Sequence, residues 1–113
     1  MTQITTHILD TSLGRPAANV PVVLDFQTAA GVWTEAGRGS TNADGRCKDL
    51  LADKSLQAGT YRLTFDTGAY FSARKIESLY PQVTIIFAVK NAREHYHIPL
   101  LLSPYGYSTY RGS

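Results

Sequence analysis

The amino-acid sequence predicts an all-β fold, a sandwich or a barrel, and three observations support this prediction. Glycine and proline, nine and five residues respectively, recur at short intervals along the 113-residue chain. Short runs of β-branched and aromatic residues lie between them, which is typical of strands joined by turns. No segment shows the strand–helix–strand alternation of a parallel α/β sheet. With 43% hydrophobic and 18% charged residues, residues 1–113 are expected to form one globular domain around one core.

The positions of glycine and proline, together with the hydrophobic pattern, predict the individual secondary-structure elements. We expect strands at Gln3–Leu9, Val20–Thr28, Val32–Gly39, Thr60–Asp66, Val83–Val89, His95–Leu102 and, in shorter form, Tyr107–Tyr110. A turn is predicted at Asn42–Gly45, because Gly45 can adopt a positive φ. One short helix is predicted at Phe71–Leu79, which ends before Pro81.

Alternation within the first and last long strands decides which residues face the core, since successive side chains of a strand point to opposite faces. In the first strand Ile4, Thr6 and Ile8 take one face, so His7 lies on the other with Thr5 and Leu9. In the late strand Tyr96, Ile98, Leu100 and Leu102 take one face. His95 and His97 therefore share the opposite face.

Charge, cysteine content and hydropathy exclude several classes of protein. The net charge is only +2 and no basic run is present, which argues against a nucleic-acid partner. Neither a secretory signal nor an apolar run of membrane-spanning length is visible. The single Cys47 cannot form a disulfide within the chain, as suits a reducing compartment. We expect a cytoplasmic protein with no membrane partner.

The three histidines and one arginine are the residues whose types suit catalysis. His7, His95 and His97 all fall in predicted strands, and an imidazole can move protons or orient water near neutral pH. Arg46 follows a tight turn, so its planar guanidinium group could reach a substrate carbonyl oxygen that gains negative charge during the reaction. The residue types alone also allow structural histidines and a solvated hairpin arginine.

The segment His95-Tyr96-His97 also suggests a metal site, because two histidines on one strand face can chelate a divalent ion. A catalytic site needs three ligands and a structural site four, and His7 is the only other histidine. We therefore expect neither a metal nor a cofactor. Cys47 has no neighbouring base in the sequence, so a thiol nucleophile is not expected.

The C-terminal tail, Ser103–Ser113, is rich in tyrosine almost to its last residue. Most chain termini are polar and frayed, so this composition indicates a tail that packs against something. An edge strand with a purely structural role is the alternative.

Four segments stand in order along the chain: Ile4–Asp10 (ITTHILD), Gly14–Ala17 (GRPA), Asp44–Arg46 (DGR) and the long ending His95–Ser113. Together they resemble the transthyretin-like 5-hydroxyisourate hydrolases. The second and third segments are weak signals alone. The ending is specific, and its terminal Tyr-Arg-Gly-Ser is the signature of the family.

The resemblance implies a two-sheet antiparallel sandwich with one short helix, assembled as a homotetramer with active sites at the interface between dimers. The implied reaction is hydrolysis of 5-hydroxyisourate to 2-oxo-4-hydroxy-4-carboxy-5-ureidoimidazoline in urate breakdown. The resemblance implies catalytic roles for His7, Arg46 and His97. It implies substrate contacts from His95 and from the tail residues Tyr110, Arg111, Gly112 and Ser113.

The sequence also allows two functions other than hydrolysis. A transthyretin-like binding protein would carry a small hydrophobic ligand in the same channel, but it would not need His7, Arg46 and His97 together. An immunoglobulin-like adhesion module is disfavoured by the missing signal segment and the single cysteine.

Overall fold

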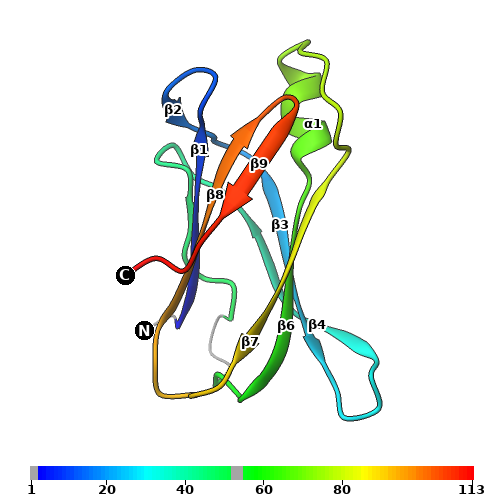
Figure 1. Ribbon diagram of the computed structural model, residues 1–113, viewed down its shortest axis with the longest axis vertical. Helices are drawn as coiled ribbons and strands as arrows, with labels where there is room; N and C mark the ends of the chain where they lie inside the picture. Colours follow the sequence, from blue (N-terminus) through cyan, green and yellow to red (C-terminus); the bar gives the residue numbers. More distant parts are fainter. Residues whose placement is uncertain (1–2, 52–54) are drawn as a thin grey trace.

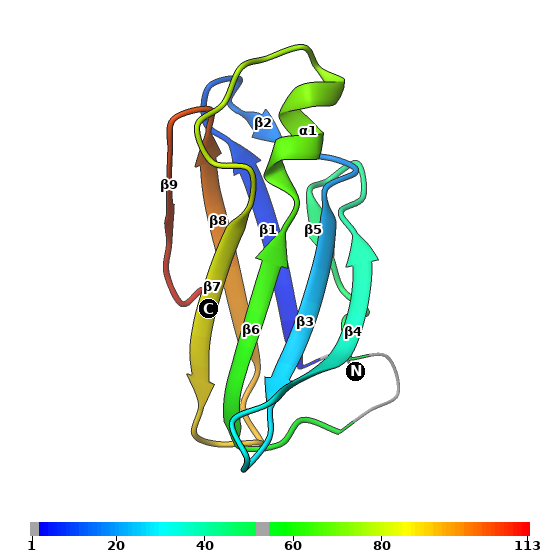
Figure 2. The same ribbon diagram turned by 90° about the vertical axis from the view of Figure 1, so that its right-hand side faces the viewer.

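The computed structural model describes residues 3–51 and 55–113, and within these residues the strands form two facing sheets (Figure 1). The first sheet contains β1 (Ile4–Asp10), β2 (Arg15–Pro16), β5 (Arg46–Cys47), β8 (Tyr96–Ser103) and β9 (Gly106–Thr109). The second contains β3 (Pro21–Gln27), β4 (Trp33–Ser40), β6 (Gly59–Phe65) and β7 (Val83–Val89). Figure 2 shows the second sheet in front of β8, β1 and β5.

The predicted strands are confirmed, and each observed bound lies within one residue of the expected one. The two-residue strands β2 and β5 were not predicted, because such short segments carry no periodic pattern. Pairing is mostly antiparallel, as expected, but β1 and β8 pair in parallel. These two strands are far apart in the sequence, so no hairpin forces them to run in opposite directions.

The core lies between the two sheets and follows the predicted alternation. In β1, Ile4, Thr6 and Ile8 are buried, whereas His7 is only partly buried. The hydroxyl of the buried Thr6 donates a hydrogen bond to the Ile98 carbonyl on β8. The buried hydrophobic residues come from both sheets and from the helix. The face of β1 that carries His7 is therefore turned away from the core.

The helix prediction was wrong in its bounds, since α1 spans Thr67–Ala73 rather than residues 71–79. The helix starts early because the Asp66 carboxylate caps it, accepting a hydrogen bond of 3.1 Å from the Ala69 amide. It ends early because Lys75 adopts a left-handed φ of 60°. Phe71 packs in the core as expected, but Leu79 is exposed.

The turn before β5 is confirmed, and it fixes where Arg46 emerges. The Gly45 amide donates to the Asn42 carbonyl, and the Asn42 side chain accepts from the Arg46 amide at 3.0 Å. Gly45 has a φ of +74°, and a Cβ atom there would lie 2.5 Å from the Ile8 carbonyl oxygen. Glycine is required at this position for both reasons.

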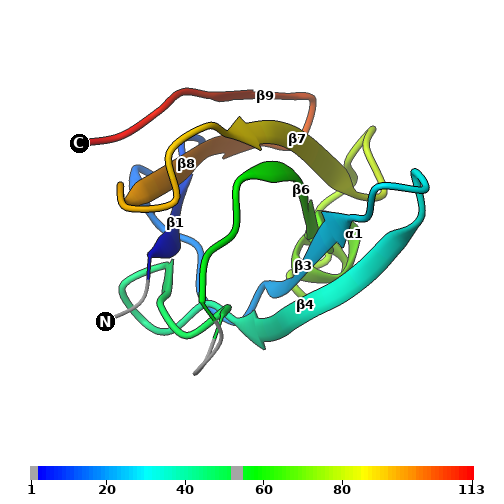
Figure 3. The same ribbon diagram turned by 90° about the horizontal axis from the view of Figure 1, so that it is seen from below.

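At the other end of the first sheet, β9 and the C-terminal tail run along the outside of the molecule (Figure 3). Within the described part of the chain, no helix is both long and apolar enough to cross a membrane. The cytoplasmic location and the single-domain organisation stay predictions.

Candidate active site

The register of three neighbouring strands places the predicted catalytic residues on one sheet face. β1 lies between β5 and β8, with His7 opposite Arg46 and Thr5 opposite His97. Paired residues of adjacent strands project to the same face of a sheet. Thr5, His7, Arg46 and His97 therefore share the face that is turned away from the core.

A surface cavity of about 350 Å³ opens on this face. Its walls come from β1, β5, β8 and the chain terminus, and its lining residues are Thr5, Thr6, Arg46, Lys48, His95, His97 and Ser113. Of the residues predicted from the sequence, the cavity brings together Arg46, His95, His97 and Ser113. His7 is not in the lining, although it is the strand neighbour of Arg46.

The Thr5 hydroxyl joins the two cavity histidines. Its Oγ1 atom lies 2.8 Å from Nδ1 of His97 and 3.0 Å from Nε2 of His95. The two imidazole rings are nearly parallel, with centroids 6.4 Å apart and an interplanar angle of 18°. With Nδ1 engaged by Thr5, the Nε2 atom of His97 is left for a substrate or a water molecule.

The surroundings keep His97 uncharged near neutral pH. Burial lowers the pKa of its imidazole, and the nearby charge of Arg46 lowers this pKa further. His95 and His7 act in the same direction, against a backbone hydrogen bond at Thr5 that raises the pKa. A neutral imidazole retains a lone pair, which a general base requires.

The C-terminal tail crosses β8 and ends at the cavity. After β9, the Gly112 amide donates a hydrogen bond of 2.8 Å to the His97 carbonyl. A Cβ atom on Gly112 would lie 2.5 Å from Cδ2 of His97, so only glycine lets the backbone approach the ring this closely. The tail is therefore packed, as its composition predicted, and it delivers Ser113 to the cavity.

Of the four tail residues predicted to bind substrate, Tyr110, Arg111 and Gly112 lie outside the cavity lining. Tyr110 is 57% exposed. The guanidinium group of Arg111 donates to a Glu94 carboxylate oxygen at 3.0 Å and lies 4.4 Å from the centre of the Tyr96 ring. Their assignment as substrate-binding residues stays a prediction.

Sequence analysis missed three polar residues of the lining, Thr5, Lys48 and the buried Thr6. Thr5 had been placed on the same strand face as His7, and its spacing could have identified it as a site residue. Lys48 stands two residues after Arg46, a spacing that favours the same side of the chain. Among the described residues that line the cavity, none has an acidic side chain, whereas Arg46 and Lys48 are cationic. Such a site suits an anion or an oxygen atom that gains negative charge.

The described residues offer neither a metal site nor an activated thiol at this face. Across residues 3–51 and 55–113, no group of three or more His, Cys, Asp and Glu side chains is arranged to hold a metal ion. Cys47 points away from this face and is buried, and the burial raises the pKa of its thiol. The site that remains is built from imidazole, guanidinium, ammonium and hydroxyl groups.

Comparison with known proteins shows the family. Residues 4–112 match the model of the HIUase/Transthyretin family. The 5-hydroxyisourate hydrolase of Salmonella typhimurium is 46% identical over 110 residues, which cover 97% of this chain and 80% of that protein. The structure of Klebsiella pneumoniae 5-hydroxyisourate hydrolase superposes with a TM-score of 0.87 at 39% identity, with 100% of both chains covered.

A transthyretin structure is similar to this chain in fold to about the same degree, but its sequence identity is lower. Sea bream transthyretin, solved in complex with thyroxine, superposes with a TM-score of 0.91 at 32% identity and covers 97% of this chain and 94% of its own. The sandwich with one helix agrees with both sets of structures. Sequence and structure together place this chain in the HIUase/Transthyretin family.

Proposed function

We propose that this protein is a 5-hydroxyisourate hydrolase of urate degradation. The observation that carries this proposal is the cavity in which His97, His95 and Arg46 meet beside the C-terminal Ser113. The hydrolases of Salmonella and Klebsiella share 39–46% of their residues with this chain over nearly its whole length. The cavity supplies what hydrolysis of a cyclic amide needs: a base, a cationic partner for an oxyanion, and groups that orient the substrate.

We assign the role of general base to His97. The Thr5 hydroxyl has one proton, so it can donate to only one of its two imidazole neighbours. When it donates to Nε2 of His95, its oxygen accepts the Nδ1 proton of His97. Nε2 of His97 is then unprotonated and can accept a proton from the attacking water. The lowered pKa of His97 favours the neutral form that this step requires.

The remaining steps follow from the same atoms. The water oxygen bonds to a ring carbonyl carbon while its proton passes to Nε2 of His97, and the carbonyl oxygen becomes an oxyanion. Arg46 is placed to stabilise that charge, and Lys48 adds a second cation to the same cavity. The ring C–N bond then breaks, and the leaving nitrogen takes the proton back from His97. His7, beside Arg46, orients the substrate or the water.

We also propose that the active form is a homotetramer with sites at the interface between dimers. The cavity opens on the outer face of the first sheet, and Arg46, His95 and Ser113 are all exposed in the single chain. A second copy packed on this face would exclude bulk water, and that exclusion would strengthen every charge interaction inside the site.

A carrier of small hydrophobic ligands is the second candidate, because sea bream transthyretin shares the fold closely. A carrier cavity has no use for a neutral histidine next to an arginine. The test is to generate 5-hydroxyisourate from urate with urate oxidase, add the protein, and follow the ultraviolet absorbance of the intermediate. Faster decay supports the hydrolase. Unchanged decay together with thyroxine binding would establish the carrier.

A further inference from the structure

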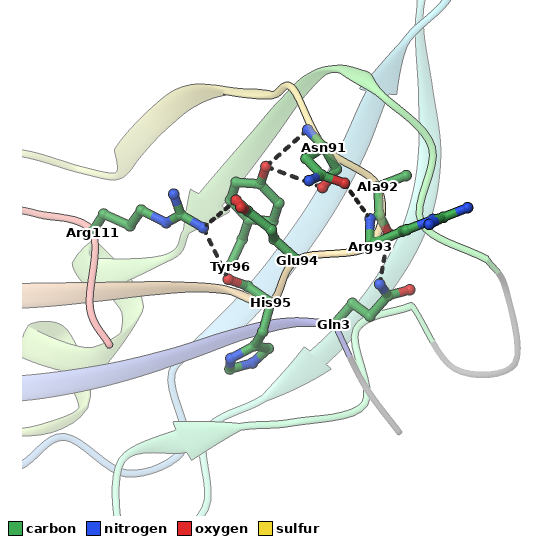
Figure 4. A network of polar contacts seen from close by, with 8 residues as sticks. All are labelled: Gln3, Asn91, Ala92, Arg93, Glu94, His95, Tyr96 and Arg111. Atoms are coloured by element: carbon green, nitrogen blue, oxygen red, sulfur yellow. Dashed lines mark hydrogen bonds and ion pairs between the residues drawn. The ribbon is translucent and has the colours of Figure 1, made fainter.

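Arg111 makes three contacts that together hold it on the side of β8 away from the cavity (Figure 4). Its guanidinium donates to a Glu94 carboxylate oxygen at 3.0 Å and to the His95 carbonyl at 3.2 Å. Its Cζ atom lies 4.4 Å from the centre of the Tyr96 ring. Arg111 thus contacts the backbone of His95 and the two residues that flank it in sequence, and its own side chain is not part of the cavity lining.

Burial and hydrogen bonds fix the surface that receives Arg111. Tyr96 is buried, and its hydroxyl donates to the Asn91 carbonyl at 3.2 Å and accepts from the Asn91 amide at 3.1 Å. The same loop is tied to the start of β1, because the Gln3 side chain donates to the Ala92 carbonyl at 2.7 Å. Figure 4 shows these contacts beside the hydrogen bonds of Arg111 to Glu94 and His95.

The residues that follow Arg111 are the ones that reach the site. The Gly112 backbone lies against the His97 ring, and Ser113 lines the cavity. These are the last two residues of the chain, and chain ends fray unless something ties them down. A backbone bridge to β8, which includes the hydrogen bond from the Gly112 amide to the His97 carbonyl, also holds this end of the tail.

We propose that Glu94, Arg111 and Tyr96 form an anchor that docks Gly112 and Ser113 against His97, and that Arg111 is a positioning residue rather than a substrate ligand. This inference rests on the proposed hydrolase function. The ion pair alone is weak, because Arg111 and Glu94 are 54% and 50% exposed. Its effect comes from adding a cation–π contact and a carbonyl hydrogen bond on a surface that is itself hydrogen-bonded.

The variants Glu94→Gln, Arg111→Gln and their combination test the anchor. Two readouts are needed: hydrogen exchange of the Gly112 amide, and kcat and KM on 5-hydroxyisourate. We expect Arg111→Gln to speed Gly112 exchange and to lower kcat/KM by about tenfold, and Glu94→Gln to do the same by about threefold. The double variant should lose no more than Arg111→Gln alone, because both side chains belong to one anchor.

Glu35→Gln is the matched control, since it removes the exposed ion pair with Arg38 on β4, away from the cavity. It should change neither readout. Loss of kcat/KM in Arg111→Gln with unchanged Gly112 exchange would overturn the inference, because Arg111 would then act on the substrate directly. Additive losses in the double variant would also overturn it. If the parent protein did not hydrolyse 5-hydroxyisourate, the proposed function would fail, while the exchange data would still decide whether the anchor exists.

Discussion

Replacing Thr5 with valine should separate the orientation of His97 from the rest of the site. Valine keeps the shape of threonine but lacks the hydroxyl that lies 2.8 Å from Nδ1 of His97 and 3.0 Å from Nε2 of His95. Thr5 is on the partly buried outer face of β1, so the change leaves the core side of the strand untouched. The variant should fold as the parent does and lose turnover.

The expected loss follows from the two hydrogen bonds. Each is worth about 1 kcal/mol net, and only the bond to His97 selects the tautomer with a free Nε2 lone pair. Losing this bond and the fixed ring orientation should raise the barrier by about 1–2 kcal/mol, which is about a 5- to 30-fold fall in kcat. KM should change less, because the Thr5 hydroxyl is already occupied by the two rings.

The assay is the steady-state decay of 5-hydroxyisourate absorbance, with thermal melting as the check on folding. Thr5→Ser is the matched variant, since serine keeps the hydroxyl, and it should retain most of the parent kcat. If Thr5→Val stayed within twofold of the parent, the hydroxyl would have no part in setting the His97 tautomer. If Thr5→Ser lost as much as Thr5→Val, the effect would come from packing instead.

Four further predictions concern the same site. His97→Ala and His7→Ala should each lower kcat by about a hundredfold or more in the absorbance assay, whereas His95→Ala should cost less; a fully active His97→Ala enzyme would remove the proposed base. Arg46→Lys should restore little of the activity lost in Arg46→Ala, because lysine lacks the planar fork, and full activity would point to a simple charge effect. The pKa of His97 is lowered, and its neutral form is the active one. We therefore expect kcat/KM to stay level from neutral pH down to 6.5, the ordinary pKa of histidine, and to fall only below it. A fall in kcat/KM that begins above pH 6.5 would contradict the assignment. Ending the chain after Thr109 should leave a folded tetramer, by melting and by size, that has lost most turnover, and unchanged turnover would exclude the tail from the site.

Much of the site could be predicted from the sequence because strand alternation is a local property. The alternation of Ile4, Thr6 and Ile8 predicted that Thr5 and His7 face away from the core. In the structure both residues lie on the outer face of β1. The tyrosine-rich tail indicated a packed end, and the Gly112 contact with His97 accounts for it. The family followed from short motifs whose residues stand in order along the chain.

The helix shows how a local signal can be outweighed by another. The spacing of Phe71 and Leu79 favoured a later helix, and Asp66 was read as the last residue of a strand. In the structure Asp66 lies after the end of β6 and is the N-cap residue of α1. Its carboxylate accepts a hydrogen bond from the Ala69 amide, which has no partner within the first helical turn.

By itself the sequence determined the all-β class, the seven longer strands to within one residue, the faces of β1 and β8, and the residue types available for hydrolysis, but not the short strands β2 and β5. Only the tertiary structure decided that β1 and β8 run in parallel, that Thr5 lies opposite His97, and that Arg46 lies opposite His7. It also decided that Arg111 faces Glu94 rather than the cavity. The physical reason is that alternation depends on neighbours in the chain, whereas register joins strands up to 92 residues apart and is set by how the whole core packs.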